Sequence, residues 1–246
     1  MESYRPQTYG DRIADFYDDW HDRPDTAAAV EALASLGGAG PVLELAVGTG
    51  RIALPLAQRG LDVHGIDASE AMVGRLRSKA GGERVKVSMG DMADVAVEGS
   101  FSLVFAVFNS FFALLTQGDQ LRCFTNVGQR LQPGGVFVLE CFVPEMRLFD
   151  RGQRVSAVAV ELDQARLDVT RHYLAEQRVE TQHVLITGDR VRLVPVALRY
   201  AWPSELDLMA RLAGLRLRHR WGGWGREPFG DDSALHVSVY EKPEAG

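Results

Sequence analysis

The sequence predicts an α/β protein built on a doubly wound parallel sheet, with an antiparallel sheet inserted into its second half. Between residues 41 and 142, short apolar runs alternate with helical periods and glycine-rich connections, which is the pattern of repeated βαβ units. Between residues 155 and 200, polar and apolar residues alternate with a period of two instead, as in antiparallel strands. Helical and strand patterns then return before residue 241. The antiparallel stretch therefore interrupts an α/β chain.

Composition and charge exclude several classes of protein. The chain has 246 residues, of which 46% are hydrophobic and 24% charged, as in globular rather than disordered proteins. Its 27 basic and 33 acidic residues give a formal charge of −6, so no global positive field attracts nucleic acid. No run reaches the ~18 apolar residues of a membrane span, and the polar amino end lacks a signal-peptide core. We therefore expect a cytoplasmic protein with neither a nucleic-acid nor a membrane partner.

The first half of the chain begins with two amphipathic segments, at residues 12–20 and 26–36, before the strand–helix units start. Gly37 and Gly38 are the stop signal of the second segment. One later run, residues 101–108, is almost wholly apolar, as expected of a central parallel strand covered on both faces. In chain order, we predict strands at residues 41–47, 62–66, 84–88, 101–108 and 136–142, and helices at 51–59, 70–80 and 120–131.

The second half begins with four segments in which polar and apolar residues alternate, and it ends with a helix and two strands. Gly188 and Asp189 are a hairpin-turn signal within the alternating region. The helix covers residues 205–212 and ends at Gly214. The predicted strands of this half cover residues 155–162, 166–173, 178–187, 191–200, 215–221 and 235–241.

A glycine-rich turn after the first strand indicates a nucleotide site. Gly48 and Gly50 begin a G-x-G-x-x-A pattern that follows the strand and precedes a helix, so a ligand can approach the backbone at a helix amino terminus. Asp67 lies 17 residues beyond Gly50, where the second strand ends. A carboxylate at that position can accept hydrogen bonds from ribose hydroxyls. Together these features predict an adenosine-containing ligand, either a nicotinamide dinucleotide or S-adenosylmethionine.

Two further acids favour S-adenosylmethionine. Glu44 interrupts the apolar first strand, and a carboxylate there needs a charged or hydrogen-bonding partner. The ammonium group of a methionine moiety is such a partner, whereas a pyrophosphate is not. Asp91 follows the third strand in Gly90-Asp91-Met92, where it can accept from an adenine amino group while Met92 packs on the ring. Alternatively, Glu44 pairs with an internal arginine and Asp91 caps a turn.

The motifs ELAVGTGR, GIDAS, GDM and LQPGG, in this order and at these spacings, resemble those of class I S-adenosylmethionine-dependent methyltransferases of the small-molecule branch. The resemblance implies a Rossmann-like, seven-stranded, mostly parallel sheet with helices on both faces. It also implies a single domain over residues 1–246, with an inserted antiparallel roof at about 150–200. One departure is that Ala46 stands where the commonest first motif has glycine.

The resemblance also assigns residues to the cofactor. The segment around Tyr9 and Tyr17 resembles the amino-terminal helix of that branch, whose tyrosines close over the methionine end, and ordinary interfacial packing is the alternative. Met72 typically lies against the adenine or ribose, although helix packing alone would also explain it. The full predicted cofactor set is Tyr9, Tyr17, Glu44, Ala46, Gly48, Gly50, Arg51, Asp67, Ala68, Met72, Gly90, Asp91, Met92 and Phe108.

We expect the acceptor site beyond the carboxyl ends of the first and fourth strands, near Asn109. The Asn109 amide can orient an amine or hydroxyl, and the phenylalanines that follow at 111 and 112 can exclude water; a turn residue beside core phenylalanines is the alternative. His172 and His183 fall in the inserted strands and are candidates for a general base, although a histidine on a strand face is more frequent. No histidine or cysteine spacing predicts a metal site.

The inserted sheet resembles those of nucleotide-amino-sugar N,N-dimethyltransferases and of cypemycin-type peptide N-methyltransferases. Both groups methylate amines, so the resemblance implies a small-molecule or peptide amine acceptor and a monomer or homodimer. Trp221, Trp224 and Arg226 either line the acceptor entrance or belong to a surface loop without a role. O- or C-methylation, an NAD-dependent oxidoreductase and a non-catalytic binding domain remain as alternatives.

Overall fold

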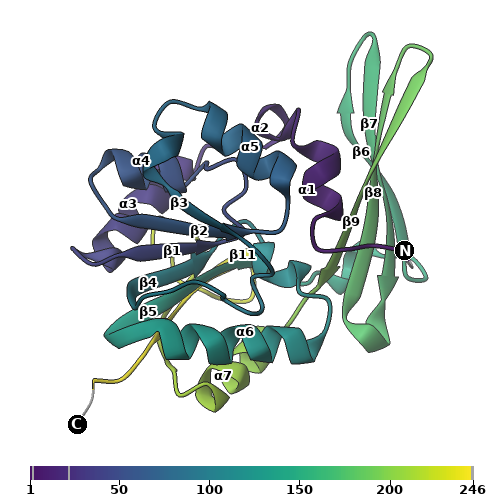
Figure 1. Ribbon diagram of the computed structural model, residues 1–246. Coiled ribbons are helices and arrows are strands. Elements are labelled where there is room, and N and C mark those ends of the chain that lie inside the picture. The colour runs from purple at the N-terminus through teal and green to yellow at the C-terminus, as the bar shows by residue number, and fades with distance from the viewer. Residues whose placement is uncertain (2, 22, 245–246) are drawn as a thin grey trace.

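The computed structural model describes residues 1, 3–21 and 23–244, and in them it forms two sheets (Figure 1). The larger is a seven-stranded sheet in the order β10-β11-β5-β4-β1-β2-β3. The pairs among β1 to β5 are parallel, whereas β11 runs antiparallel to both of its neighbours. Its strands are β1 (Val42–Leu45), β2 (Val63–Asp67), β3 (Lys86–Met89), β4 (Phe101–Ala106), β5 (Leu131–Phe142), β10 (Arg216–Trp221) and β11 (Leu235–Glu241).

Helices cover both faces of this sheet, so its central strands bury alternate residues on opposite sides (Figure 1). In β4, Leu103 and Phe105 join the cluster under α3 and α4, while Val104 and Ala106 join the cluster under α6 and α7. This double burial explains why the strand is apolar throughout. The helices are α1 (Thr8–Ile13), α2 (Tyr17–Trp20), α3 (Thr26–Gly37), α4 (Ala53–Gln58), α5 (Glu70–Ser78), α6 (Gln117–Arg130) and α7 (Pro203–Leu212), with 3₁₀ turns η1 (Gly82–Arg84), η2 (Ser110–Ala113), η3 (Met146–Leu148) and η4 (Leu174–Glu176).

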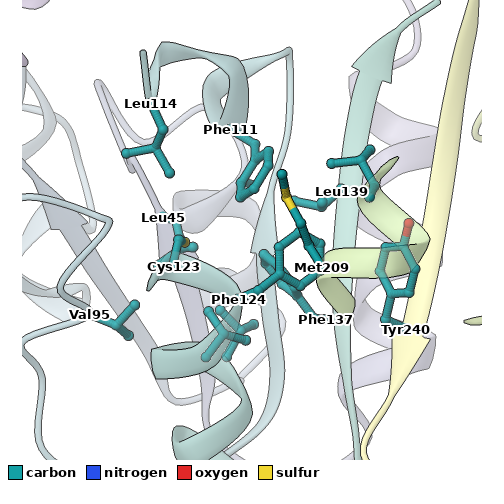
Figure 2. Close-up of a cluster of buried hydrophobic side chains, with 14 of the residues drawn as sticks. Leu45, Val95, Phe111, Leu114, Cys123, Phe124, Phe137, Leu139, Met209 and Tyr240 are labelled. Carbon is teal, nitrogen blue, oxygen red and sulfur yellow. The ribbon is translucent and has the colours of Figure 1, made fainter. Parts of the chain in front are cut away.

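An aromatic cluster holds α6 and α7 against the sheet (Figure 2). The Phe124 ring of α6 meets Phe137 of β5 at 5.1 Å and Tyr240 of β11 at 5.5 Å between centroids, both edge to face. Edge-to-face pairs of this kind add about 0.5–1.5 kcal/mol beyond their burial. Cys123 lies in the same cluster, and Cys141 is also buried with a free thiol. This core fixes the sheet edge where the site is built.

The second sheet is four-stranded and stands beside the first, with α1 between them, and the amino terminus lies against the second sheet (Figure 1). Its strands pair antiparallel in chain order, and Gly188-Asp189 forms the tight turn between the last two, as predicted. The strands are β6 (Gln153–Val160), β7 (Gln164–Tyr173), β8 (Arg178–Thr187) and β9 (Arg190–Arg199). Below, this sheet is called the roof.

The predicted fold class is confirmed, although some elements differ from their predicted bounds. The strand predicted at residues 136–142 begins at Leu131, and the helix predicted at residues 120–131 ends at Arg130. The amphipathic segment predicted at residues 12–20 is two short helices, α1 and α2, because Phe16 leaves the helical region with φ −134°. Its ring then packs on Trp20 at 4.6 Å between centroids. Among the described residues, no helix has the length and apolar character needed to cross a membrane.

Candidate active site

A cavity of about 510 Å³ opens where the carboxyl ends of β1 to β4 face the amino-terminal helices and the roof. Strand order reverses between β1 and β4, and such switch points are the usual ligand sites of open α/β sheets. The volume suits a cofactor or another small organic ligand. Of the predicted site residues, the cavity is lined by Tyr9, Tyr17, Ala46, Gly48, Asp67, Ala68, Met72, Gly90, Asp91, Met92, Phe108, Asn109 and His183.

At the end of β1, a smaller space of about 20 Å³ shares residues with the main cavity and reaches Glu44 and Arg51. Glu44 is only 3% exposed, and burial raises the pKa of its carboxyl to about 8. Among the described residues, neither Glu44 Oε2 nor the buried Nε of Arg51 has a hydrogen-bond partner. Buried polar atoms are seldom left unpaired. The space itself holds about one water molecule, but an ammonium group reaching it from the main cavity could donate to Glu44, and a carboxylate could accept from Arg51.

The turn after β1 lets a ligand approach the backbone. Ala46, Gly48 and Gly50 all have positive φ, at 56°, 56° and 83°. A side chain at Gly48 would come within 3.3 Å of the Met72 side chain, at the cavity wall. Gly50 does not line the cavity, and a Cβ there would meet Leu54 at 3.0 Å. A side chain at Gly48 would therefore narrow the cavity, whereas one at Gly50 would disturb packing of the turn.

Asp67 ends β2 and organises the neighbouring loops. Its Oδ2 accepts from the Gly48 N–H at 2.8 Å and its Oδ1 from the Ser69 N–H at 2.9 Å. Burial raises the pKa of this carboxyl. Each carboxylate oxygen keeps a second lone pair, so Asp67 can also accept from ribose hydroxyls. Ser69 caps α5 by accepting from the Met72 N–H at 3.2 Å, so Asp67 itself is not the helix cap.

Asp91 and Met92 follow β3 at the wall of the cavity. Asp91 Oδ1 accepts from the Ala93 N–H at 2.8 Å, which forms the turn that sequence analysis left open as an alternative. The Gly90 N–H donates to the Asp67 backbone carbonyl at 2.9 Å, so the two loops are joined. Asp91 and Met92 both line the cavity, and the turn leaves the other Asp91 oxygen available to a ligand.

The end of β4 carries two consecutive left-handed residues, Phe108 at φ 55° and Asn109 at φ 63°. The Phe108 N–H donates to buried Glu140 Oε2 at 2.8 Å. Asn109 Oδ1 accepts from the Phe142 N–H at 2.6 Å, so this oxygen joins β4 to β5 rather than facing an acceptor. The guanidinium carbons of Arg23 and Arg51 lie 4.8 and 5.2 Å from the centroid of the Phe108 ring.

The structure places two groups of candidate acceptor-side aromatics away from the cavity, which for the phenylalanines is the core alternative. The phenylalanines after Asn109, Phe111 and Phe112, are fully buried in the core and do not wall the cavity. Trp224 is also buried, and the Arg226 guanidinium lies over the Trp221 ring at 5.2 Å. Neither tryptophan nor Arg226 is among the described cavity residues. Phe111 and Phe112 pack in the cluster under α6 and α7, and Trp224 packs in the cluster under α3 and α4.

The amino-terminal helices close the cavity with a histidine that sequence analysis did not select. The Tyr9 hydroxyl and His21 Nε2 are 2.8 Å apart, and the Tyr17 ring lies 4.6 Å from the His21 ring. Burial lowers the pKa of His21 to about 4 and raises the pKa of Tyr17 to about 12. No sequence motif indicates His21, because its hydrogen-bond partner Tyr9 lies 12 residues earlier in the chain. Asp18 of α2 forms an ion pair with Lys79, at the end of α5, with 2.7 Å between the carboxylate oxygen and the ammonium nitrogen.

The two histidines that are general-base candidates lie in different surroundings on the roof. His183 on β8 lines the cavity, and its Nδ1 lies 2.6 Å from Asp168 Oδ1 on β7. His172 lies on the same roof face as Asp168 but is absent from the described cavity lining. Its Nε2 is instead paired with the Tyr200 hydroxyl at 2.9 Å. His183 therefore lies at the cavity, whereas His172 does not line it.

Comparisons with known proteins agree with this geometry. The family described as methyltransferase domain matches residues 42–135. The CcbJ methyltransferase of Streptomyces caelestis is 40% identical, with 98% of this chain and 100% of that chain covered and a TM-score of 0.93. Cypemycin N-terminal methyltransferase of a Streptomyces species is 26% identical over 82% of each chain. CalS10 of Micromonospora echinaspora, an amino pentose methyltransferase solved with S-adenosylmethionine, has the same fold at 21% identity, 91% coverage of each chain and a TM-score of 0.67.

Proposed function

The chain belongs to the class I S-adenosylmethionine-dependent methyltransferases of the natural-product branch, and from that premise we propose that it methylates an amine nitrogen of a small molecule or peptide. Bound S-adenosylmethionine supplies an electrophilic methyl group on a sulfonium. The observation that carries the proposal is the single cavity that joins the cofactor residues of the sheet to the inner face of the roof.

The cofactor fits one end of this cavity. Glu44 and Arg51 would hold the amino-acid end, because each has an unpaired buried atom of the required kind. Asp67 would accept from the ribose, and Asp91 with Met92 would hold the adenine. Tyr9 and Tyr17 would close the methionine end from above, since both line the cavity beneath the amino-terminal helices. This zwitterion site also argues against the NAD-dependent alternative, since a dinucleotide has no amino-acid end.

The acceptor would occupy the roof end. The cavity lining includes aliphatic side chains and the carboxylate of Asp168 on the roof, and Arg5 is the one arginine of the described lining. Such a surface attracts a cationic amine better than an anion. The cypemycin relative is named for methylation of an amino terminus, which supports nitrogen over oxygen or carbon. We propose that the roof is part of a single domain over residues 1–246, since its inner face completes the cavity.

Most of the rate would come from alignment. Holding the amine nitrogen and the methyl carbon in a near-attack geometry contributes up to ~7–11 kcal/mol in model reactions. The left-handed Phe108 and Asn109 at the end of β4 would hold the loop on which the acceptor rests. Asn109 acts through the backbone of β5 in this proposal, because its Oδ1 already accepts from Phe142.

The test is methyl transfer from a deuteromethyl donor to matched acceptors. The panel pairs an alanine-first peptide, an amino-sugar nucleotide and a small cyclic amine with the hydroxyl analogue of each. We expect a deuteromethylated product from at least one amine and from none of the hydroxyl partners, detected by mass spectrometry. The Asp67→Ala variant is the control for enzyme-dependent transfer. Methylation of a hydroxyl analogue in preference to its amine would overturn the nitrogen assignment.

A further inference from the structure

The roof places a carboxylate–histidine pair on the wall of the cavity. Asp168 on β7 and His183 on β8 are directly opposite in the antiparallel register, and Asp168 Oδ1 lies 2.6 Å from His183 Nδ1. Both line the cavity, with 28% and 19% of their side chains exposed. A carboxylate that accepts only from Nδ1–H selects one neutral tautomer of the imidazole. His183 Nε2 is then the unprotonated nitrogen.

The surroundings of His183 supply no competing base. Tyr9 from α1 and Trp20 from α2 pack against it, with ring centroids at 6.5 and 6.2 Å. The Arg166 guanidinium from β7 lies over the Trp20 ring at 4.7 Å. Burial lowers the pKa of His21 to about 4, so His21 takes up a proton poorly at neutral pH. Burial also raises the pKa of Tyr9, which keeps its hydroxyl protonated.

The other acids of the cavity lining are occupied elsewhere. Asp67 and Asp91 accept from backbone N–H groups at the cofactor end. Asp119 is paired with Arg122 at 2.7 Å. Only the Asp168 and His183 pair, among the described titratable residues of the lining, combines a roof position with an oriented nitrogen lone pair.

We propose that His183 accepts the proton of the acceptor amine and that Asp168 is its positioning residue. The inference rests on the amine acceptor proposed above. The N–H bond of the ammonium breaks as its proton passes to His183 Nε2, and the electron pair stays on nitrogen. That nitrogen then bonds to the methyl carbon as the sulfur–methyl bond breaks, with its electron pair left on sulfur. His183 afterwards returns the proton to solvent.

The first test needs no acceptor. Long-range ¹H–¹⁵N NMR of the histidine-labelled full-length protein, saturated with S-adenosylhomocysteine, reports the tautomer of each ring. We expect neutral His183 to carry its proton on Nδ1, and Asp168→Asn to shift the ring toward the Nε2–H form, because the amide can donate to Nδ1. An Nε2–H tautomer in the unmodified protein would overturn the inference whatever the acceptor proves to be.

The second test is kinetic and uses the amine that the acceptor panel identifies. We expect His183→Ala to lower kcat by about 10²–10⁴-fold near pH 7 with KM for the amine nearly unchanged, and the loss to shrink at higher pH as free amine accumulates. Asp168→Asn should lower kcat by about 10-fold or more, and Asp168→Glu should restore part of it.

The matched control is His172→Gln, a histidine on the same roof face that is paired with Tyr200 outside the cavity lining. We expect its kcat to stay within about twofold of the unmodified enzyme. A His183→Gln variant serves if the alanine variant does not fold. Activity of either His183 variant within about threefold of the unmodified enzyme from about pH 6 to about pH 9 would refute the role. Transfer only to hydroxyl analogues would refute the amine acceptor instead, so the two failures differ.

Discussion

Cofactor binding should expel a proton from Glu44. This carboxyl is 3% exposed, its Oε2 has no partner among the described residues, and burial raises its pKa to about 8. At pH 7 it is therefore neutral in roughly nine of ten free molecules. A bound ammonium stabilises the carboxylate instead. Binding of S-adenosylhomocysteine near pH 7 is thus expected to release about 0.9 proton per site from Glu44.

The same carboxyl makes the free protein less stable as pH rises. Its pKa is raised from 4.5 to about 8 on folding, so the neutral form is favoured in the folded state. The stabilisation is fully present below about pH 4.5 and is lost as pH rises through about 8. At ~1.4 kcal/mol per tenfold change, the full loss is about 5 kcal/mol. The cofactor ammonium offsets this loss, so the increase in melting temperature caused by S-adenosylhomocysteine should grow between about pH 6 and pH 8.

Isothermal titration calorimetry measures the released proton directly. S-adenosylhomocysteine is titrated near pH 7 in buffers of different ionisation enthalpy, and the slope of the observed enthalpy gives the number of protons. Glu44→Gln should reduce the release to near zero and weaken binding. Glu205→Gln removes a carboxylate that pairs with Arg199 at 2.7 Å outside the cavity lining, and it should leave the release unchanged. A zero slope in the unmodified protein would refute the reasoning.

Three substitutions test the loops around the cavity. Asp67→Ala should weaken S-adenosylhomocysteine binding in calorimetry by a few kcal/mol, at ~1.5–3 for each hydrogen bond to a charged group; unchanged affinity would exclude the ribose role. Asn109→Ala should lower the free energy of unfolding in urea by about 1–3 kcal/mol, because the Phe142 N–H loses its acceptor, with cofactor affinity within about twofold. Ala46→Gly should raise the free energy of unfolding by about 0.5–1 kcal/mol. The substitution removes the ~1–2 kcal/mol strain of alanine at φ 56°, and the greater entropy of glycine in the unfolded chain cancels part of this gain.

The cofactor side of the site could be predicted because its residues follow from local order. Glu44 lies within β1, and Asp67 and Asp91 come at or just after the ends of β2 and β3. Parallel strands end at the same edge of a sheet, so three separate motifs converge without any knowledge of side-chain packing. The fold class follows from the same periodicity. The cavity accordingly contains the predicted aspartates, while Glu44 lines the small space beside it.

The roof side could not be predicted in the same way. His172 and His183 lie on neighbouring strands with equivalent alternation, and the sequence does not specify which residue each one faces. A slip of one residue in antiparallel register moves every side chain to the opposite face. The turn at η4, where Gln177 adopts φ 51°, sets the register that pairs Asp168 with His183 and places His172, four residues further along β7, opposite Val179. Only the folded hairpin distinguishes the two histidines.

Nearness in the sequence to Asn109 did not predict which phenylalanine reaches the cavity, because the direction of the backbone changes after β4. Phe108 and Asn109 both adopt left-handed φ, which turns the chain sharply after β4. That turn brings the Phe108 ring to the cavity, while the phenylalanine three residues later, Phe111, is fully buried in the core. Left-handed non-glycine residues are costly and concentrate at functional sites. Ala46 at the end of β1 has the same conformation, so a strained non-glycine residue follows each of the two strands at the β1–β4 switch point. There the backbone must bend away to leave room for a ligand.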